Sequence, residues 1–244
     1  MGTYTFTSSN LPAPITVEHE GVLVVRDDLF PGGTKARFLG LLFNGAEEVV
    51  YASPAEGGAQ VALATVARKL SKRATIFVAR RAKPHPRTIE AANLGAKVVS
   101  IAPGYLSVVQ ARAREYCAQT GAQLMPFGAD MPDAITAIAA AACAIGIKPD
   151  EVWCAAGSGV LARGLAAAWP YARRHAVQVG RTLTLYDVAG AMIHIYPAPF
   201  GREVRTHAPF PCDPYYEAKA WEVSKARKVT GRVVFWNVTG LAGG

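Results

Sequence analysis

Residues 22–42 read VLVVRDDLFPGGTKARFLGLL, a β-branched run followed by two glycines and an apolar-periodic segment. The run Val22–Val25 predicts a strand, and the apolar spacing after Lys35 predicts a helix with one buried side. The Gly32–Gly33 pair lets the backbone come close to a flat ligand. Lys35 stands at the helix start, where partial burial makes an amine a usable nucleophile for Schiff-base formation with an aldehyde. A helix-start lysine that points at solvent is the alternative on this segment alone.

Strand and helix patterns alternate along the chain. The predicted strands are Val22–Val25, Glu48–Tyr51, Thr75–Ala79, Lys97–Ile101, Gln123–Met125, Glu151–Cys154, Thr182–Leu185 and Arg232–Trp236. The predicted helices are Ala59–Leu70, Arg87–Leu94, Leu106–Thr120, Pro132–Ile145 and Val160–Arg174. This alternation favours an α/β fold with mostly parallel sheets that helices cover on both faces. Ligands of such folds bind where glycine-containing turns leave the carboxyl ends of strands. Such turns occur at Gly32–Gly33, Gly57–Gly58 and Gly157–Gly159.

The composition predicts a cytoplasmic globular protein. Its 244 residues are 51% hydrophobic, enough for one large domain or two smaller ones that share a cleft. The opening residues lack the basic start and apolar stretch of a secretory signal. The longest apolar run, residues 134–147, is too short to span a bilayer. The four cysteines are scattered without metal-ligand spacing, so we expect free thiols in a reducing compartment and no metal site: Cys117, Cys143, Cys154 and Cys212.

The formal net charge is +8, and basic residues gather in segments 80–87, 173–175 and 225–228. This balance attracts anionic partners, which include phosphate cofactors, acidic substrates and nucleic acid. Solvated surface segments are the alternative interpretation.

The turn Gly157-Ser158-Gly159 follows one predicted strand and opens a helix. Small residues there expose several backbone N–H groups at a helix start, which suits a phosphate group. The turn is not a P-loop, because no Gly-Lys-Ser/Thr follows it. An ordinary tight turn is the alternative.

These segments occur in the order of a known family. Residues 26–37 resemble the lysine motif of the fold-type II pyridoxal-phosphate enzymes, which are related to the tryptophan synthase β subunit. Within them the resemblance is closest to the branch of 1-aminocyclopropane-1-carboxylate deaminase and D-cysteine desulfhydrase. Four further segments resemble that branch's substrate loop, phosphate loop, tyrosine-bearing segment and closing motif, in this order: residues 53–64, 157–159, 212–220 and 235–240.

The resemblance implies a tryptophan synthase β-like fold of two αβα lobes, here shortened. Residues 1–45 and 129–244 would form the large, cofactor-binding lobe, and residues 46–128 the small lobe with the substrate loop. Pyridoxal 5'-phosphate would lie in the cleft between them. The implied activity is that of a lyase or deaminase that acts on an amino acid as a small-molecule substrate, and a homodimer is expected.

The resemblance also assigns roles to individual residues. Lys35 would hold the cofactor as an aldimine and move protons at the substrate α-carbon. Tyr216 would be an acid/base or nucleophilic partner if its pKa is lowered. Thr239 would meet the pyridine nitrogen and, as a hydroxyl, leave it unprotonated. The remaining cofactor-binding residues would be Gly157, Ser158, Gly159, Val160, Leu161 and Asn237. The substrate-binding residues would be Ser53, Gly57, Gly58 and Gln60.

The sequence departs from the family pattern in three places. Gly58 stands where an Asn normally packs against the cofactor ring, ungapped matching puts Val238 at the hydroxyl position of Thr239, and the stretch between Gly159 and Tyr216 is short. Three other functions therefore stay open. One is a pyridoxal-phosphate enzyme acting on an amino acid attached to a modified DNA base. Another is a phosphoribosyltransferase-like enzyme, suggested by residues 22–34, and the third is a non-catalytic binding protein.

Overall fold

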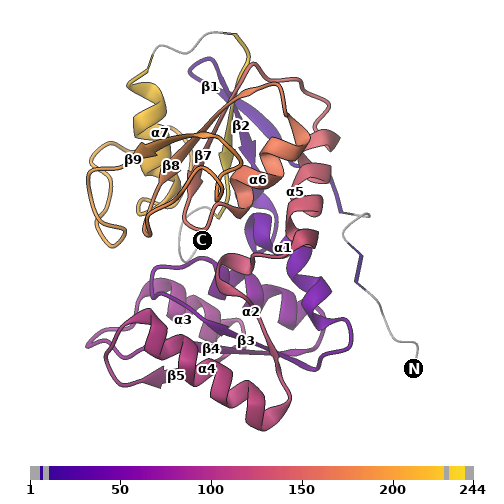
Figure 1. Ribbon diagram of the computed structural model, residues 1–244, viewed down its shortest axis with the longest axis vertical. Coiled ribbons are helices and arrows are strands. Elements are labelled where there is room, and N and C mark those ends of the chain that lie inside the picture. The colour runs from indigo at the N-terminus through magenta and orange to yellow at the C-terminus, as the bar shows by residue number, and fades with distance from the viewer. Residues whose placement is uncertain (1–5, 8–10, 228–230, 240–244) are drawn as a thin grey trace. The chain divides into compact units, whose positions relative to one another are not determined.

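The computed structural model describes residues 6–7, 11–227 and 231–239 (Figure 1). The chain divides into two compact units. Among the described residues, the small unit comprises 6–7 and 35–129, and the large unit comprises 11–34, 130–227 and 231–239.

The large unit contains a six-stranded sheet in the order β1-β2-β10-β7-β8-β9. Its strands are β1 (Thr16–His19), β2 (Val22–Arg26), β10 (Val233–Asn237), β7 (Glu151–Ala156), β8 (Arg173–Gln178) and β9 (Met192–Ile195). All neighbouring pairs are parallel except β1 and β2. Helices α5 (Pro132–Ala144) and α6 (Val160–Ala168) lie on one face of this sheet, and α7 (Glu217–Lys225) lies on the other (Figure 1).

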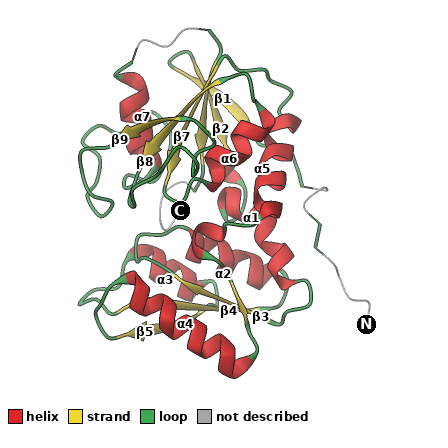
Figure 2. Cartoon of the chain, in the orientation of Figure 1, coloured by secondary structure: helices red, strands yellow, loops and turns green. Residues whose placement is uncertain are grey.

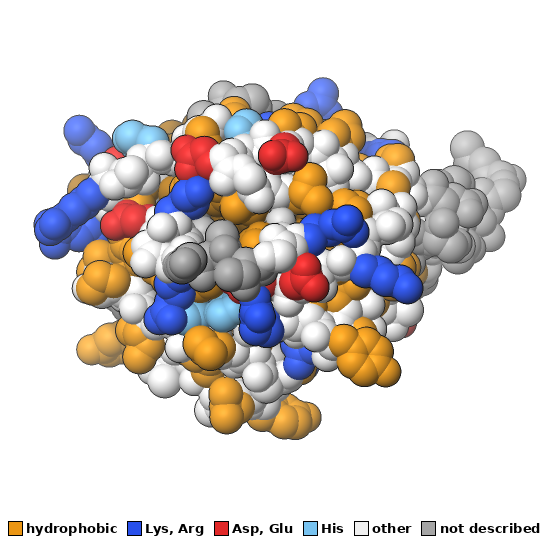
Figure 3. Space-filling view, turned by 90° about the horizontal axis from the view of Figure 1, so that it is seen from above, with side chains coloured by type: hydrophobic (Ala, Val, Ile, Leu, Met, Phe, Trp, Pro, Cys, Tyr) orange, Lys and Arg blue, Asp and Glu red, His pale blue; other side chains and the backbone are white. Residues whose placement is uncertain are grey.

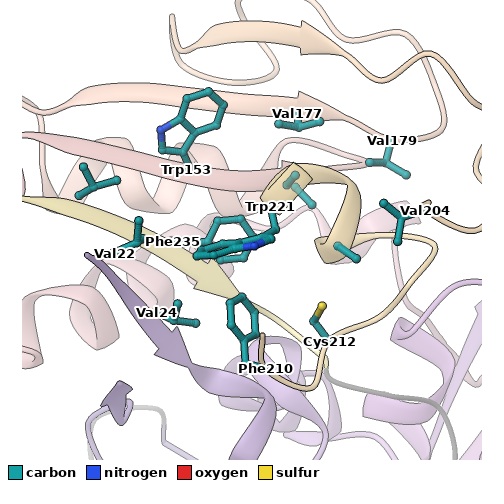
Figure 4. Close-up of a cluster of buried hydrophobic side chains, with 14 residues drawn as sticks. Val22, Val24, Trp153, Val177, Val179, Val204, Phe210, Cys212, Trp221 and Phe235 are labelled. Atoms are coloured by element: carbon teal, nitrogen blue, oxygen red, sulfur yellow. The ribbon is translucent and has the colours of Figure 1, made fainter. Parts of the chain in front are cut away.

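Alternate residues of the central strands build the core beneath α7, because successive side chains of a strand point to opposite faces. Trp153, Val177 and Phe235 face the helix from three strands, as Figure 4 shows. Trp221 of α7 meets Phe235 edge-on, with ring centroids 5.3 Å apart. This packing holds α7 against the sheet and so fixes the position of its first turn.

The small unit contains a four-stranded, all-parallel sheet in the order β5-β4-β3-β6. Its strands are β5 (Lys97–Ile101), β4 (Arg73–Ala79), β3 (Glu48–Ala52) and β6 (Gln123–Leu124). Helix α4 (Leu106–Thr120) covers one face, where it packs on alternate residues of β3 and β4. Helices α2 (Ala59–Lys69) and α3 (Pro86–Asn93) pack together on the other face (Figure 1). Helix α1 (Gly33–Leu39) and the 3-10 turn η3 (Gly40–Phe43) precede β3.

The predicted α/β fold with mostly parallel sheets is confirmed, and most elements lie where the sequence places them (Figure 2). The strand predicted at Thr182–Leu185 is wrong, because that segment is a loop. A strand forms at Arg173–Gln178 instead. The helix predicted just before it is too long, because the last residues of that predicted helix belong to this strand. Helix α6 ends at Ala168 because Pro170 follows, and proline disfavours helical backbone at the residue before it. Strands β1 and β9 and helix α7 are not among the predicted elements.

None of the helices in the described part of the chain is long and apolar enough to cross a membrane. Across the same residues, no group of three or more His, Cys, Asp or Glu side chains is arranged to hold a metal ion.

Candidate active site

The turn after β7 is shaped for an anion. Gly159 has φ +89°, and a Cβ there would collide with the main-chain carbonyl oxygen of Asp187. The turn leads into α6, whose N-cap Gly159 makes no side-chain hydrogen bond. The first N–H groups of a helix have no acceptor within the helix, so those of Val160 and Leu161 remain available to a ligand. A phosphate dianion fits this glycine-bounded helix start.

Tyr216 lies against the same turn. Its hydroxyl donates a hydrogen bond to the carbonyl oxygen of Ala155 at 3.4 Å, and a Cβ on Gly157 would lie 3.3 Å from that hydroxyl. Burial, followed by the charge of Glu217, raises the pKa of Tyr216 well above its ordinary value. A lowered pKa, which the sequence analysis made the condition for an acid/base or nucleophilic role, is therefore not met, and Tyr216 is a neutral phenol whose O–H donates to Ala155.

The closing motif brings a buried carboxylate into the site. Thr239 donates through Oγ1 to Oε1 of Glu217 at 3.0 Å, and Oε2 of Glu217 accepts the main-chain N–H of Asp213 at 3.2 Å. Glu217 has no exposed surface. Asn237 is also fully buried, and its Nδ2 donates to Pro211 at 2.8 Å while its Oδ1 has no partner among the described residues. Sequence reasoning missed Glu217, although an acid directly after Tyr216 was a signal that could have found it.

Lys35 follows residues that are firmly held. The Thr34 N–H donates to the carbonyl of Val238 at 3.2 Å, and Trp236 donates through Nε1 to Thr34 Oγ1 at 2.9 Å. Gly33, with φ +67°, has no room for a Cβ because the same Val238 carbonyl lies against it. These contacts tie the first residues of α1 to the end of β10. Lys35 is the next residue in the chain and is half-buried.

The predicted substrate loop connects β3 to α2 and is closed by its own hydrogen bonds. Ser53 is buried and donates through Oγ to Pro54 at 2.8 Å, and the Gly57 N–H donates to the same carbonyl at 3.0 Å. Gln60 is fully buried, with Nε2 donating to Ala55 at 2.8 Å and Oε1 without a partner among the described residues. Gly58 is the N-cap of α2 and provides no capping side chain. The loop thus presents main-chain groups rather than a side-chain amide.

The candidate residues divide between the units. The large unit brings together, at the carboxyl edge of its sheet, the residues Gly157, Ser158, Gly159, Val160, Leu161, Tyr216, Asn237 and Thr239. The small unit contains Lys35, Ser53, Gly57, Gly58 and Gln60. Three residues that the sequence did not single out join the large-unit group, namely Glu217, Arg181 and Asp187.

The fold is that of the tryptophan synthase β-like pyridoxal-phosphate enzymes. An ACC deaminase homologue matches with a TM-score of 0.78 and 19% identity, over 91% of this chain and 85% of that one. Diaminopropionate ammonia lyase of Escherichia coli, in apo form, matches with a TM-score of 0.64 and 15% identity, over 91% and 78%. Threonine deaminase isoform 2 of Solanum lycopersicum, in its processed form, matches with a TM-score of 0.62 and 15% identity, over 91% and 76%.

Residues 6–195 match the model of the family described as pyridoxal-phosphate dependent enzyme, and the chain belongs to that family. No curated protein sequence matches the chain.

Proposed function

We propose that this protein is a lyase or deaminase that uses pyridoxal phosphate to eliminate or remove a group at the α- or β-carbon of an amino acid. The contact of Tyr216 with the Gly157 turn carries this proposal, because it places a neutral phenol beside the segment suited to the cofactor phosphate. A neutral phenol is a general acid, and elimination needs one to protonate the departing group. Structural neighbours named as a lyase and a deaminase support the same reaction class.

The chain's own residues divide the work. Pyridoxal phosphate, when bound, supplies an electron sink for negative charge at the substrate α-carbon. The Lys35 amine holds the cofactor aldehyde and later carries the proton at that carbon. The N–H groups of Gly159, Val160 and Leu161 bind the phosphate.

Glu217 and Thr239 set the protonation of the cofactor's ring nitrogen in this proposal. The Thr239 hydroxyl gives its proton to the hydrogen bond with Glu217, so its oxygen is left to accept a hydrogen bond. A carboxylate one hydrogen bond away favours a protonated ring nitrogen, since opposite charges stabilise each other in a buried site. This differs from the unprotonated nitrogen expected from Thr239 alone.

The substrate carboxylate would meet the start of α2. The main-chain N–H of Gly58 and the helix terminus that it opens provide anion donors. Ser53 supports this loop through its bond to Pro54, and the unpartnered Oε1 of Gln60 is an acceptor for a donor that the ligand brings.

The absorption spectrum of the purified protein, recorded before and after borohydride, tests the proposal. Borohydride fixes the cofactor covalently to the lysine that holds it, and peptide mass mapping then locates the added mass. We expect a visible band that borohydride bleaches and the mass on Lys35. The matched variant Lys35→Ala should be colourless and inactive, whereas Lys69→Ala, on the last residue of α2, should stay coloured. A wild-type protein that takes up no added pyridoxal phosphate would refute the proposal.

We also propose a homodimer in the cytoplasm. Free thiols at Cys117, Cys143, Cys154 and Cys212 support a reducing compartment. Exposed apolar side chains at the β9 edge, Met192 and Ile195, support self-association. Light scattering on the purified protein measures its oligomeric state, and a monomer would contradict the dimer.

The DNA-linked alternative rests on the net charge and on the open cleft that the short stretch between Gly159 and Tyr216 predicts. On the face shown in Figure 3, Lys and Arg side chains are scattered among acidic and hydrophobic ones rather than forming one stripe.

A further inference from the structure

The loop of residues 181–187 lies directly against the Gly157–Gly159 turn. Arg181 donates through Nη2 to the carbonyl oxygen of Ser158 at 3.2 Å. The main-chain carbonyl of Asp187 occupies the place that a Cβ on Gly159 would need. Two consecutive residues of the turn are therefore in contact with one loop, through a side chain at one end and the main chain at the other.

The loop is closed by its own charges. Asp187 accepts hydrogen bonds from both terminal nitrogens of Arg181, the shorter at 2.6 Å, and from the main-chain N–H of Thr184 at 2.8 Å. The hydroxyl of Thr184 donates to the same carboxylate at 2.8 Å. The Leu183 N–H donates to Oε1 of Gln178, at the end of β8, at 2.8 Å, which anchors the loop to the sheet. The guanidinium is thus held in one orientation when it meets Ser158.

The fixed orientation of the Arg181 guanidinium determines how the Ser158–Gly159 peptide is turned. A trans peptide is planar, and its C=O and N–H point in opposite directions. Since the Ser158 carbonyl points at Arg181, the Gly159 N–H of the same peptide points away from Arg181. The bond to Arg181 therefore fixes the direction of this N–H, on the side of the peptide opposite Arg181.

We propose that Arg181, held by Asp187, is a positioning residue that orients the Ser158–Gly159 peptide for the cofactor phosphate. This inference rests on the proposed function, in which the turn binds that phosphate. Arg181 acts through Ser158, so it is not assigned to the phosphate itself. The side chains of Arg181 and Asp187 are 43% and 21% exposed, so the pair adds little to overall stability and can be changed without opening the core.

We compare the affinities for pyridoxal phosphate and for pyridoxal, which lacks the phosphate. This comparison distinguishes an effect on phosphate binding from a general effect on the site. Arg181→Met keeps the side-chain length and removes every donor. We expect its Kd for pyridoxal phosphate to rise about tenfold, the factor that corresponds to one net hydrogen bond, and its Kd for pyridoxal to stay unchanged. Asp187→Ala releases the guanidinium and should also raise the Kd for pyridoxal phosphate. Arg202→Met, on an exposed arginine of the same unit, is the control with the same loss of charge and should match wild type.

The sign of the Asp187→Ala effect decides between positioning and simple attraction. If Arg181 acted only as a positive charge near the phosphate, removal of the neighbouring carboxylate would strengthen binding. Unchanged or tighter binding of pyridoxal phosphate by Asp187→Ala would overturn the inference. Equal losses for pyridoxal phosphate and pyridoxal would overturn it too, since they indicate a general disturbance. Failure of the wild-type protein to bind pyridoxal phosphate would instead refute the proposed function, and the inference with it.

Discussion

Thr239 Oγ1 lies 3.0 Å from Oε1 of Glu217, and the carboxylate that accepts this hydrogen bond has no exposed surface. A buried carboxylate is stable only with such partners, because desolvation opposes its charge. The pair therefore ties the closing motif after β10 to the first turn of α7.

Replacement of Glu217 by Gln tests whether this carboxylate matters for turnover. The amide keeps the shape of the side chain and loses the negative charge, so the ring nitrogen would lose the partner that favours its protonation. We expect kcat to fall about tenfold or more while the protein still binds pyridoxal phosphate. Steady-state kinetics and cofactor titration measure both. Glu222→Gln, on the same helix but bonded to Tyr196, should keep wild-type kinetics. An unchanged kcat in Glu217→Gln would contradict the role.

Replacement of Tyr216 by Phe removes one hydroxyl from the phosphate turn. The hydroxyl's bond to Ala155 is long, at 3.4 Å, so the free energy of unfolding should fall by less than about 1 kcal/mol. A lost general acid lowers rates by about 100-fold or more, so kcat should fall far more than stability does. Urea unfolding and kinetics on the same preparation compare the two. Tyr215→Phe loses a hydroxyl that bonds to Glu203 rather than to the turn, and serves as control. A fully active Tyr216→Phe would remove Tyr216 from the chemistry.

The sequence predicts the parallel strands and most helices of this fold because their signals are local. Lys97–Ile101 and Leu106–Thr120 are found at the predicted bounds, since periodicity and flanking turns mark both ends. The region after α6 fails for the opposite reason. Residues 182–185 have strand-like composition, but Asp187 bonds the segment into a loop through its carboxylate. A side-chain interaction of this kind leaves no period in the sequence.

The candidate site shows the same limit. The Gly157–Gly159 turn was predictable because glycine and small residues at a helix start leave the main-chain N–H groups accessible to an anion. The raised pKa of Tyr216 was not, because it depends on burial that only packing creates. The sequence did not indicate Glu217 and Arg181 as site residues, because their partners, Thr239 and Ser158, lie 22 and 23 residues away in the chain.

Alanine substitutions in the glycine turn should differ in cost. Gly159→Ala combines a positive φ with a collision against Asp187, so it should lose pyridoxal phosphate binding and more than about 2 kcal/mol of stability. Gly157→Ala meets the movable Tyr216 side chain at 3.3 Å and should cost less than about 1 kcal/mol. Gly190→Ala has φ +74° but open space, which isolates the backbone strain at about 1 kcal/mol. Urea unfolding ranks the three. If Gly159→Ala lost no more stability than Gly190→Ala, the Asp187 loop would have moved to make room for the added Cβ.

A buried histidine pair predicts how stability depends on pH. His175 Nδ1 lies 2.9 Å from His194 Nε2, and Trp153 stacks on both rings, with centroids 4.1 and 4.9 Å away. Burial lowers the pKa of His194 to about 4 and also lowers that of His175. The nearby charge of Arg227 acts in the same direction at both rings, and that of Glu151 opposes it.

The sign follows from the unfolded chain, whose histidines titrate near 6.5. Below that pH the unfolded state binds more protons than the folded state, so stability is complete above about 6.5 and is lost as the pH falls toward 4. We expect the free energy of unfolding of the wild-type protein to fall by about 1 kcal/mol more between pH 7 and pH 4.5 than that of His194→Gln. In this variant the remaining ring has no histidine partner. The expected difference is less than the full shift would give, because solvent near the sheet edge screens the rings in part.

Urea unfolding at both pH values measures this difference, and the comparison between the two proteins cancels the carboxylates that they share. His207→Gln changes an exposed histidine and should keep the wild-type pH dependence. Parallel pH profiles for wild type and His194→Gln would show that the pair stays neutral without cost to the fold.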